Sequence, residues 1–129
     1  MIVNLSSLRA SLVCAVSLEV GEHIPSEHEM MVVRNLHAMN CRGIVLSWAQ
    51  LGKWGVGHVN THRSSYLIET FTAIGYRFAV NTTDELQRNR PKGNVNLRLR
   101  NVSQPWFWLK SVLVFERIVP LQGQGCTPL

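Results

Sequence analysis

A run of apolar residues that ends in a cluster of polar ones constrains the fold of this chain most. Residues 12–20 are apolar at nearly every position, which is typical of a strand buried on both faces of a parallel sheet. Two carboxylates and an imidazole, Glu19, Glu22 and His23, close the run with the spacing E-x-x-E-H. Open α/β sheets place their sites where a strand ends at a turn into a helix. We therefore expect a functional site at this turn.

The other segments alternate between helix and strand patterns, which favours an α/β fold. Ser26 and Glu29 form a capping-box pattern at the start of the first helical segment. Glycines within residues 50–60 indicate a loop. The segments expected as helices are residues 26–40, 65–74 and 82–90. The segments expected as further strands are residues 44–48, 76–80 and 106–117, the last two open to an antiparallel arrangement.

The length of 129 residues suits one domain with a modest core. We expect that domain at residues 1–120 and a disordered, Gly- and Pro-containing tail at residues 121–129. No apolar run reaches the roughly 18 residues that a membrane-spanning helix needs, so no membrane partner is expected.

The three cysteines, Cys14, Cys41 and Cys126, are scattered and form no C-x-x-C pair. We therefore expect no disulfide framework and a reducing, cytoplasmic compartment. Cys14 lies within the first apolar run and is expected in the core. Residues 1–20 loosely resemble a signal peptide but carry no A-x-A-like cleavage site, so a signal peptide is not expected.

The formal net charge is +5, and basic residues concentrate within residues 77–100. Such a segment attracts phosphate, or is simply a solvated loop. No aromatic residue is interleaved before Trp106, so a base-stacking surface is not indicated and nucleic acid is not expected as a partner.

Several segments, taken in order, resemble the C-terminal half of a class I S-adenosylmethionine-dependent methyltransferase: SLEVGEHIP, GIVLSWA, GHVN, IGY and FWLKSVLVFER. The resemblance covers residues 12–117. In that family the sheet order is 3-2-1-4-5-7-6, with strand 7 antiparallel. The resemblance therefore implies a partial Rossmann-like sheet of strands 4-5-7-6 with flanking helices, and methyl transfer from S-adenosylmethionine to an unknown acceptor.

One part of the family pattern is missing from this sequence. The family holds most of its cofactor with a G-x-G-x-G loop and an acidic residue in the first half of the domain. No such loop precedes residue 12, and the glycines at 52, 55 and 57 do not open a helix directly after a strand. We therefore expect a truncated chain that is inactive alone. The alternative is a non-enzymatic fragment or interaction module.

The missing half also bears on partners. In the family order, the strand at residues 12–20 would lie beside a strand that this chain lacks, which leaves one strand edge unpaired. An unpaired edge is a template for pairing with another chain. We expect self-association, or docking of the missing half, through that edge.

Three interpretations of Glu19, Glu22 and His23 stay open. The carboxylates can be structural, because they favour a helix N-terminus. By resemblance, Glu19 and Glu22 can border the methionine side of the cofactor. Also by resemblance, to small-RNA 2′-O-methyltransferases and ubiquinone-pathway O-methyltransferases, Glu19, Glu22 and His23 can hold Mg²⁺ together with His58 or His62 from the loop after the next strand.

His58 is the expected catalytic residue. It lies in the segment GHVN, beyond the carboxyl end of the second expected strand, where loops line the crevice of an open sheet. The reference pKa of histidine, about 6.5, suits a general base. The alternative is a loop histidine exposed to solvent.

Overall fold

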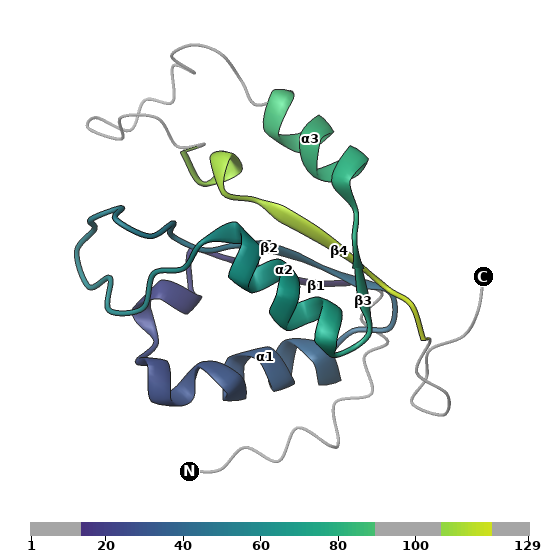
Figure 1. Ribbon diagram of the computed structural model, residues 1–129, viewed down its shortest axis with the longest axis horizontal. Helices are drawn as coiled ribbons and strands as arrows, with labels where there is room; N and C mark the ends of the chain where they lie inside the picture. The colour runs from purple at the N-terminus through teal and green to yellow at the C-terminus, as the bar shows by residue number, and fades with distance from the viewer. Residues whose placement is uncertain (1–13, 90–106, 120–129) are drawn as a thin grey trace, which may run out of the picture.

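The computed structural model describes residues 14–89 and 107–119, which form a four-stranded sheet flanked by helices (Figure 1). The strands are β1 (Cys14–Leu18), β2 (Gly43–Ser47), β3 (Tyr76–Phe78) and β4 (Leu113–Arg117). The α-helices are α1 (Glu29–Ala38), α2 (Ser64–Ala73) and α3 (Val80–Arg88). The 3-10 helices are η2 (Gly21–His23), η3 (Ser26–His28) and η4 (Phe107–Lys110).

The sheet has the order β1-β2-β4-β3. β1 and β2 are parallel, whereas β4 is antiparallel to both of its neighbours. The expected α/β class, with a mixed open sheet and flanking helices, is therefore confirmed. The strand order and the direction of β4 correspond to those expected for strands 4-5-7-6.

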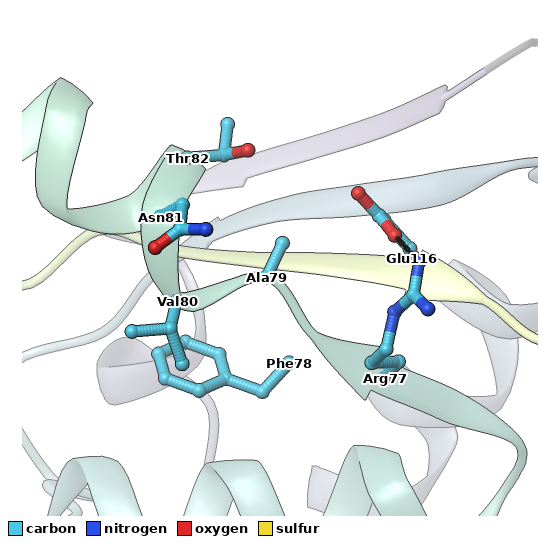
Figure 2. A pocket seen from close by; sticks show the side chains of 7 residues that line it. All are labelled: Arg77, Phe78, Ala79, Val80, Asn81, Thr82 and Glu116. Atoms are coloured by element: carbon cyan, nitrogen blue, oxygen red, sulfur yellow. Dashed lines mark hydrogen bonds and ion pairs between the residues drawn. The ribbon is translucent and has the colours of Figure 1, made fainter.

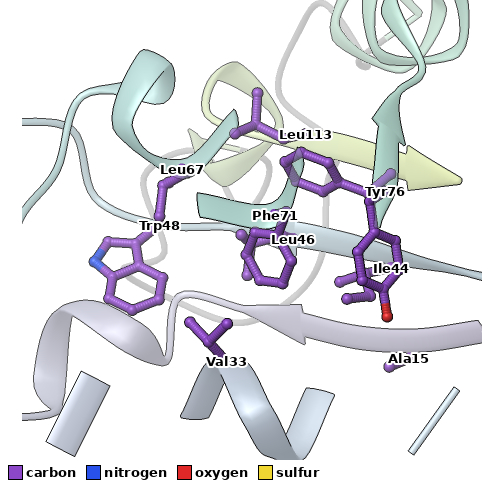
Figure 3. Packing of buried hydrophobic residues seen from close by; sticks show 10 residues of the cluster. Ala15, Val33, Ile44, Leu46, Trp48, Leu67, Phe71, Tyr76 and Leu113 are labelled. Atoms are coloured by element: carbon purple, nitrogen blue, oxygen red, sulfur yellow. The ribbon is translucent and has the colours of Figure 1, made fainter. Parts of the chain in front are cut away.

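The core lies between one face of the sheet and the helices α1 and α2. Ala15, Ile44 and Phe115 are in register across three strands and are all buried. Val33 of α1 and Phe71 of α2 belong to the same buried cluster, as Figure 3 shows. The largest fully buried side chains of the cluster are Trp48, Tyr76, Phe71 and Phe115.

The expectation that the first strand is buried on both faces is wrong. Ala15 and Ser17 are buried, but Val16 is 63% exposed and Cys14 is exposed as well. Among the described residues, β1 pairs with β2 only and so lies at an edge of the sheet. An apolar run indicates a strand, but it does not indicate how many layers cover it.

We expect the purified chain to self-associate through this edge. No described strand pairs with the outer edge of β1, and such an edge next to exposed apolar side chains such as Val16 favours pairing with a second chain. Light scattering should therefore report dimers or larger species, and the chain should bind a hydrophobic dye. A monodisperse monomer with a sharp cooperative melt and no dye binding would contradict this expectation.

Three element boundaries also differ from expectation. The capping box is wrong, because Ser26 lies in the 3-10 turn η3 and α1 begins only at Glu29, whose side chain bonds elsewhere. The third expected strand ends at Phe78, and α3 begins at Val80. The last expected strand starts late, because η4 occupies its first part and β4 begins at Leu113.

The cysteines differ from expectation too. Cys41 is disulfide-bonded, whereas Cys14 is free and exposed and so is no core residue. Spacing along the chain does not reveal which cysteines a fold brings together. The expected tail and residues 90–100 of the basic segment lie outside the described residues. In the described part of the chain, no helix combines the length and the hydropathy that crossing a membrane requires.

Candidate functional site

The polar groups that follow β1 and β2 meet at the carboxyl ends of these strands. β1 leads through Glu19 into η2, and β2 leads into the loop at residues 49–63 (Figure 1). The turn and the loop are joined by their backbones, because the N–H groups of Val59 and Asn60 both donate to the Glu22 carbonyl, at 2.8 and 3.0 Å. The expected E-x-x-E-H turn and the expected loop histidine therefore lie in one place.

Glu19 is held in a strained conformation between the strand ends. Its φ of +54° lies in the left-handed region, which is uncommon for residues other than glycine. The Glu19 N–H donates to Ser47 Oγ at 2.9 Å, and Ser47 Oγ donates to Glu19 Oε1 at 2.8 Å. Ser111 Oγ also donates to Oε1, at 3.4 Å. One oxygen of the Glu19 carboxylate, Oε1, is thus held by two hydroxyl groups.

Glu22 is fully buried, and neither of its carboxylate oxygens accepts a hydrogen bond from a described residue. Burial raises the pKa of Glu22, and the negative charge of Glu19 raises it further. A buried carboxylate without donors is costly to keep ionised. This side chain therefore calls for a cation or a proton.

His23 and His58 lie beside Glu22. Their rings are 5.0 Å apart between centroids and nearly perpendicular. Nδ1 of His23 is 3.0 Å from the Gly57 carbonyl, and Nδ1 of His58 is 3.1 Å from the Lys53 carbonyl. One ligating atom from each of Glu22, His23 and His58 lies within 4.8 Å of the other two. The expected metal set is therefore brought together except for Glu19, which bonds to Ser47 and Ser111.

Trp48 packs against the turn that carries Glu22 and His23. The Trp48 side chain is buried, and Nε1 donates to the Asn60 carbonyl at 2.6 Å. The ring lies so close to Gly21 that a Cβ built there would come within 2.1 Å of it. The glycine in E-V-G-E-H is thus the residue that lets the turn lie against Trp48.

A second polar cluster, which the sequence did not predict, surrounds Glu29. This carboxylate is buried at the start of α1 and accepts hydrogen bonds from Asn60 Nδ2 at 2.8 Å and from His62 Nε2 at 2.5 Å. The Tyr66 hydroxyl donates to its other oxygen, and the Tyr66 ring stacks on His62 at 4.1 Å. An ionised Glu29 fixes the proton of neutral His62 on Nε2, which leaves the Nδ1 lone pair for another group.

The pKa of Glu29 is lowered although burial alone would raise it, because the hydrogen bonds from Tyr66, Asn60 and His62 outweigh the burial. The hydrogen bond between Tyr66 and Glu29 raises the pKa of Tyr66, and burial raises it further. A lowered pKa means that Glu29 stabilises the fold at a pH above 4.5, the usual value for this carboxyl.

We expect that stability to be lost as the pH falls below 4.5 and through the lower pKa of Glu29 in the folded chain. Urea unfolding at several pH values measures the loss. In Glu29→Gln the part due to this carboxylate should be absent, so the variant should lose less stability in that window. If the unfolding free energies of the two proteins fall in parallel with pH, the cluster does not lower the pKa of Glu29.

Two cavities in the described part of the chain lie away from the Glu22 cluster. One of about 340 Å³ lies where β3 leads into α3, with Arg77 and Glu116 ion-paired at one end (Figure 2). The other, of about 260 Å³, is lined by Gln50, Leu51, Arg63 and Ser64. Neither is lined by an expected site residue.

Histidines elsewhere are also away from the site. His28 is exposed, and His37 bonds to the guanidinium of Arg117. Comparison with known proteins adds no assignment, because no family model, no curated protein and no solved structure matches this chain.

Proposed function

We propose that this chain is the C-terminal half of a domain that transfers a methyl group from S-adenosylmethionine to an oxygen, nitrogen or carbon acceptor. One observation carries the proposal. The sheet order β1-β2-β4-β3, with β4 antiparallel between two neighbours, corresponds to strands 4-5-7-6 of the family that the sequence resembles. Polar side chains gather at the carboxyl ends of β1 and β2, where open α/β sheets bind their ligands.

The residues have distinct roles in this proposal. Glu19 and Glu22 border the methionine side of the cofactor, and the loop that carries His58 faces the acceptor. The cofactor supplies the methyl group on a sulfonium, so the protein mainly has to hold the acceptor in line with it. The ring of His58 lies beside that of His23 in the turn, at 5.0 Å between centroids, so His58 can take a proton from an acceptor bound there.

A second candidate function is an interaction module without catalysis. The exposed edge and the exposed Val16 of β1 favour it, since they offer a surface for another chain. In that case the polar cluster is structural. The two candidates differ in whether S-adenosylmethionine binds once the remainder of the sheet is supplied.

Calorimetry with S-adenosylmethionine tests the proposal. Without a G-x-G-x-G loop, the chain alone should bind no better than about millimolar, which corresponds to about 4 kcal/mol. A longer protein that adds an upstream strand followed by G-x-G-x-G should bind it at least about a hundredfold more tightly, since each tenfold gain needs only about 1.4 kcal/mol. If the longer protein binds no better than the chain alone, the methyltransferase assignment fails.

A further inference from the structure

We propose that His37 and Arg117 form a pH-sensitive latch between the end of α1 and β4. The latch is closed while His37 is neutral, and it opens once His37 binds a proton. Neither residue belongs to the Glu22 cluster or has a role in the proposed methyl transfer. The latch therefore stands or fails independently of that function.

The first observation is that the guanidinium of Arg117 closes the C-terminal end of α1. The last backbone carbonyls of an α-helix have no partner within the helix. Nη1 of Arg117 donates to the carbonyl of His37 at 2.7 Å and to that of Asn40, just beyond the helix, at 2.8 Å. The Arg117 N–H donates to the Arg42 carbonyl at 2.7 Å. Because the helix dipole favours a cation at this end, Arg117 fastens the last turn of α1 to the sheet.

The second observation is that the same guanidinium requires one protonation state of His37. Nη2 of Arg117 is 3.0 Å from Nε2 of His37. A guanidinium can only donate, so this contact is a hydrogen bond only when Nε2 carries no proton. The ring proton then lies on Nδ1, which is buried and has no partner among the described residues. The closed latch therefore requires a neutral His37.

The third observation concerns the groups around His37. Tyr76 of β3 and Arg117 of β4 are the described titratable groups in contact with its ring, and the Tyr76 ring lies edge-on to it at 5.6 Å between centroids. Among the described residues, neither His37 nor Arg117 is paired with a carboxylate. Burial lowers the pKa of His37, and the positive charge of Arg117 lowers it further. Nothing described near the ring therefore stabilises its charged form.

Protonation of His37 opens the latch for an electrostatic reason. It places two positive charges on nitrogens that are 3.0 Å apart and replaces the acceptor at Nε2 with a second donor. The lowered pKa means that neutral His37 stabilises the fold above pH 6.5, the usual value for histidine. This stability is lost as the pH falls below 6.5 and through the lower pKa of His37 in the folded chain. We expect the last turn of α1 to detach from β4 in that window.

Amide hydrogen exchange in the full chain tests whether the helix end opens. The Met39 N–H donates to the Asn35 carbonyl at 3.0 Å and reports on the last turn of α1. His37→Gln keeps a side-chain acceptor but cannot bind the proton, so it should stay closed. At about pH 5 the Met39 amide should exchange at least about tenfold faster in the unmodified chain than in His37→Gln, and at about pH 8 the two should agree. His28→Gln, which changes an exposed histidine, is the matched control and should exchange as the unmodified chain does.

An NMR titration of the histidine rings tests the role of Arg117. The pKa of His37 should lie below 6.5 in the unmodified chain and rise in Arg117→Gln, which removes the positive charge. A pKa of His37 at or above 6.5 would overturn the latch, as would a value that Arg117→Gln leaves in place. Equal exchange of the Met39 amide at about pH 5 in the unmodified chain and in His37→Gln would overturn it as well.

Discussion

Trp48→Ala should cost about 3–5 kcal/mol of unfolding free energy, a large part of the total for a small domain. Trp48 is only 1% exposed and belongs to the main core cluster. Its removal leaves a cavity beneath the E-x-x-E-H turn and leaves the Asn60 carbonyl without the bond from Nε1. Urea unfolding should show a lower midpoint, or an unfolded chain in water.

The same stretch of chain offers a matched control. Trp54 is 98% exposed, so Trp54→Ala should change the unfolding free energy by less than about 0.5 kcal/mol. Trp48→Phe should fall between the two, because it keeps most of the packing and loses the hydrogen bond to Asn60. Equal stabilities for Trp48→Ala and Trp54→Ala would show that Trp48 does not support the turn.

Gly21→Ala should be the second large effect, at about 1–3 kcal/mol. A Cβ at this position would come within 2.1–2.3 Å of three atoms of the Trp48 ring. The ring is buried and cannot swing aside, so the turn that carries Glu22 and His23 must move. We therefore expect a lower Tm in this variant.

Gly52→Ala serves as the control for Gly21→Ala. Gly52 has a φ of +80° but has no described heavy atom near its Cβ position, so it incurs backbone strain without a clash. Such strain costs about 1 kcal/mol. If Gly21→Ala leaves the Tm unchanged, the turn does not pack on Trp48 as described.

Much of the fold could be predicted because its signals are local. Apolar runs located β1 and β2, and Gly75, with a φ of +98°, follows α2 as expected. The exposure of β1 could not be predicted, because the same apolar sequence pattern occurs in edge strands and in central strands. Phe107–Lys110 was predicted as part of a strand, because four residues are too few to distinguish a 3-10 helix from an extended segment by sequence.

The candidate site was predicted in part for a similar reason. Glu22, His23 and His58 could be grouped because the resemblance to methyltransferases with an E-x-x-E-H motif implies it, and these three side chains do lie close together. Glu29 could not be assigned to the second cluster. Its spacing from Ser26 is that of a capping box, and nothing near it in the sequence indicates its actual partners. The bonds from His62 and Tyr66 span more than thirty residues, and no short-range pattern records them.

We propose that the turn after β1 and the loop after β2 form one ligand site that faces S-adenosylmethionine. Amide chemical-shift mapping of the ¹⁵N-labelled chain tests this claim directly, because it detects binding even at about millimolar affinity. Millimolar S-adenosylmethionine should shift the amides of residues 19–23 and 57–62 and leave those of residues 77–82 in place. Shifts confined to residues 77–82, or no shifts at saturating concentration, would contradict the claim.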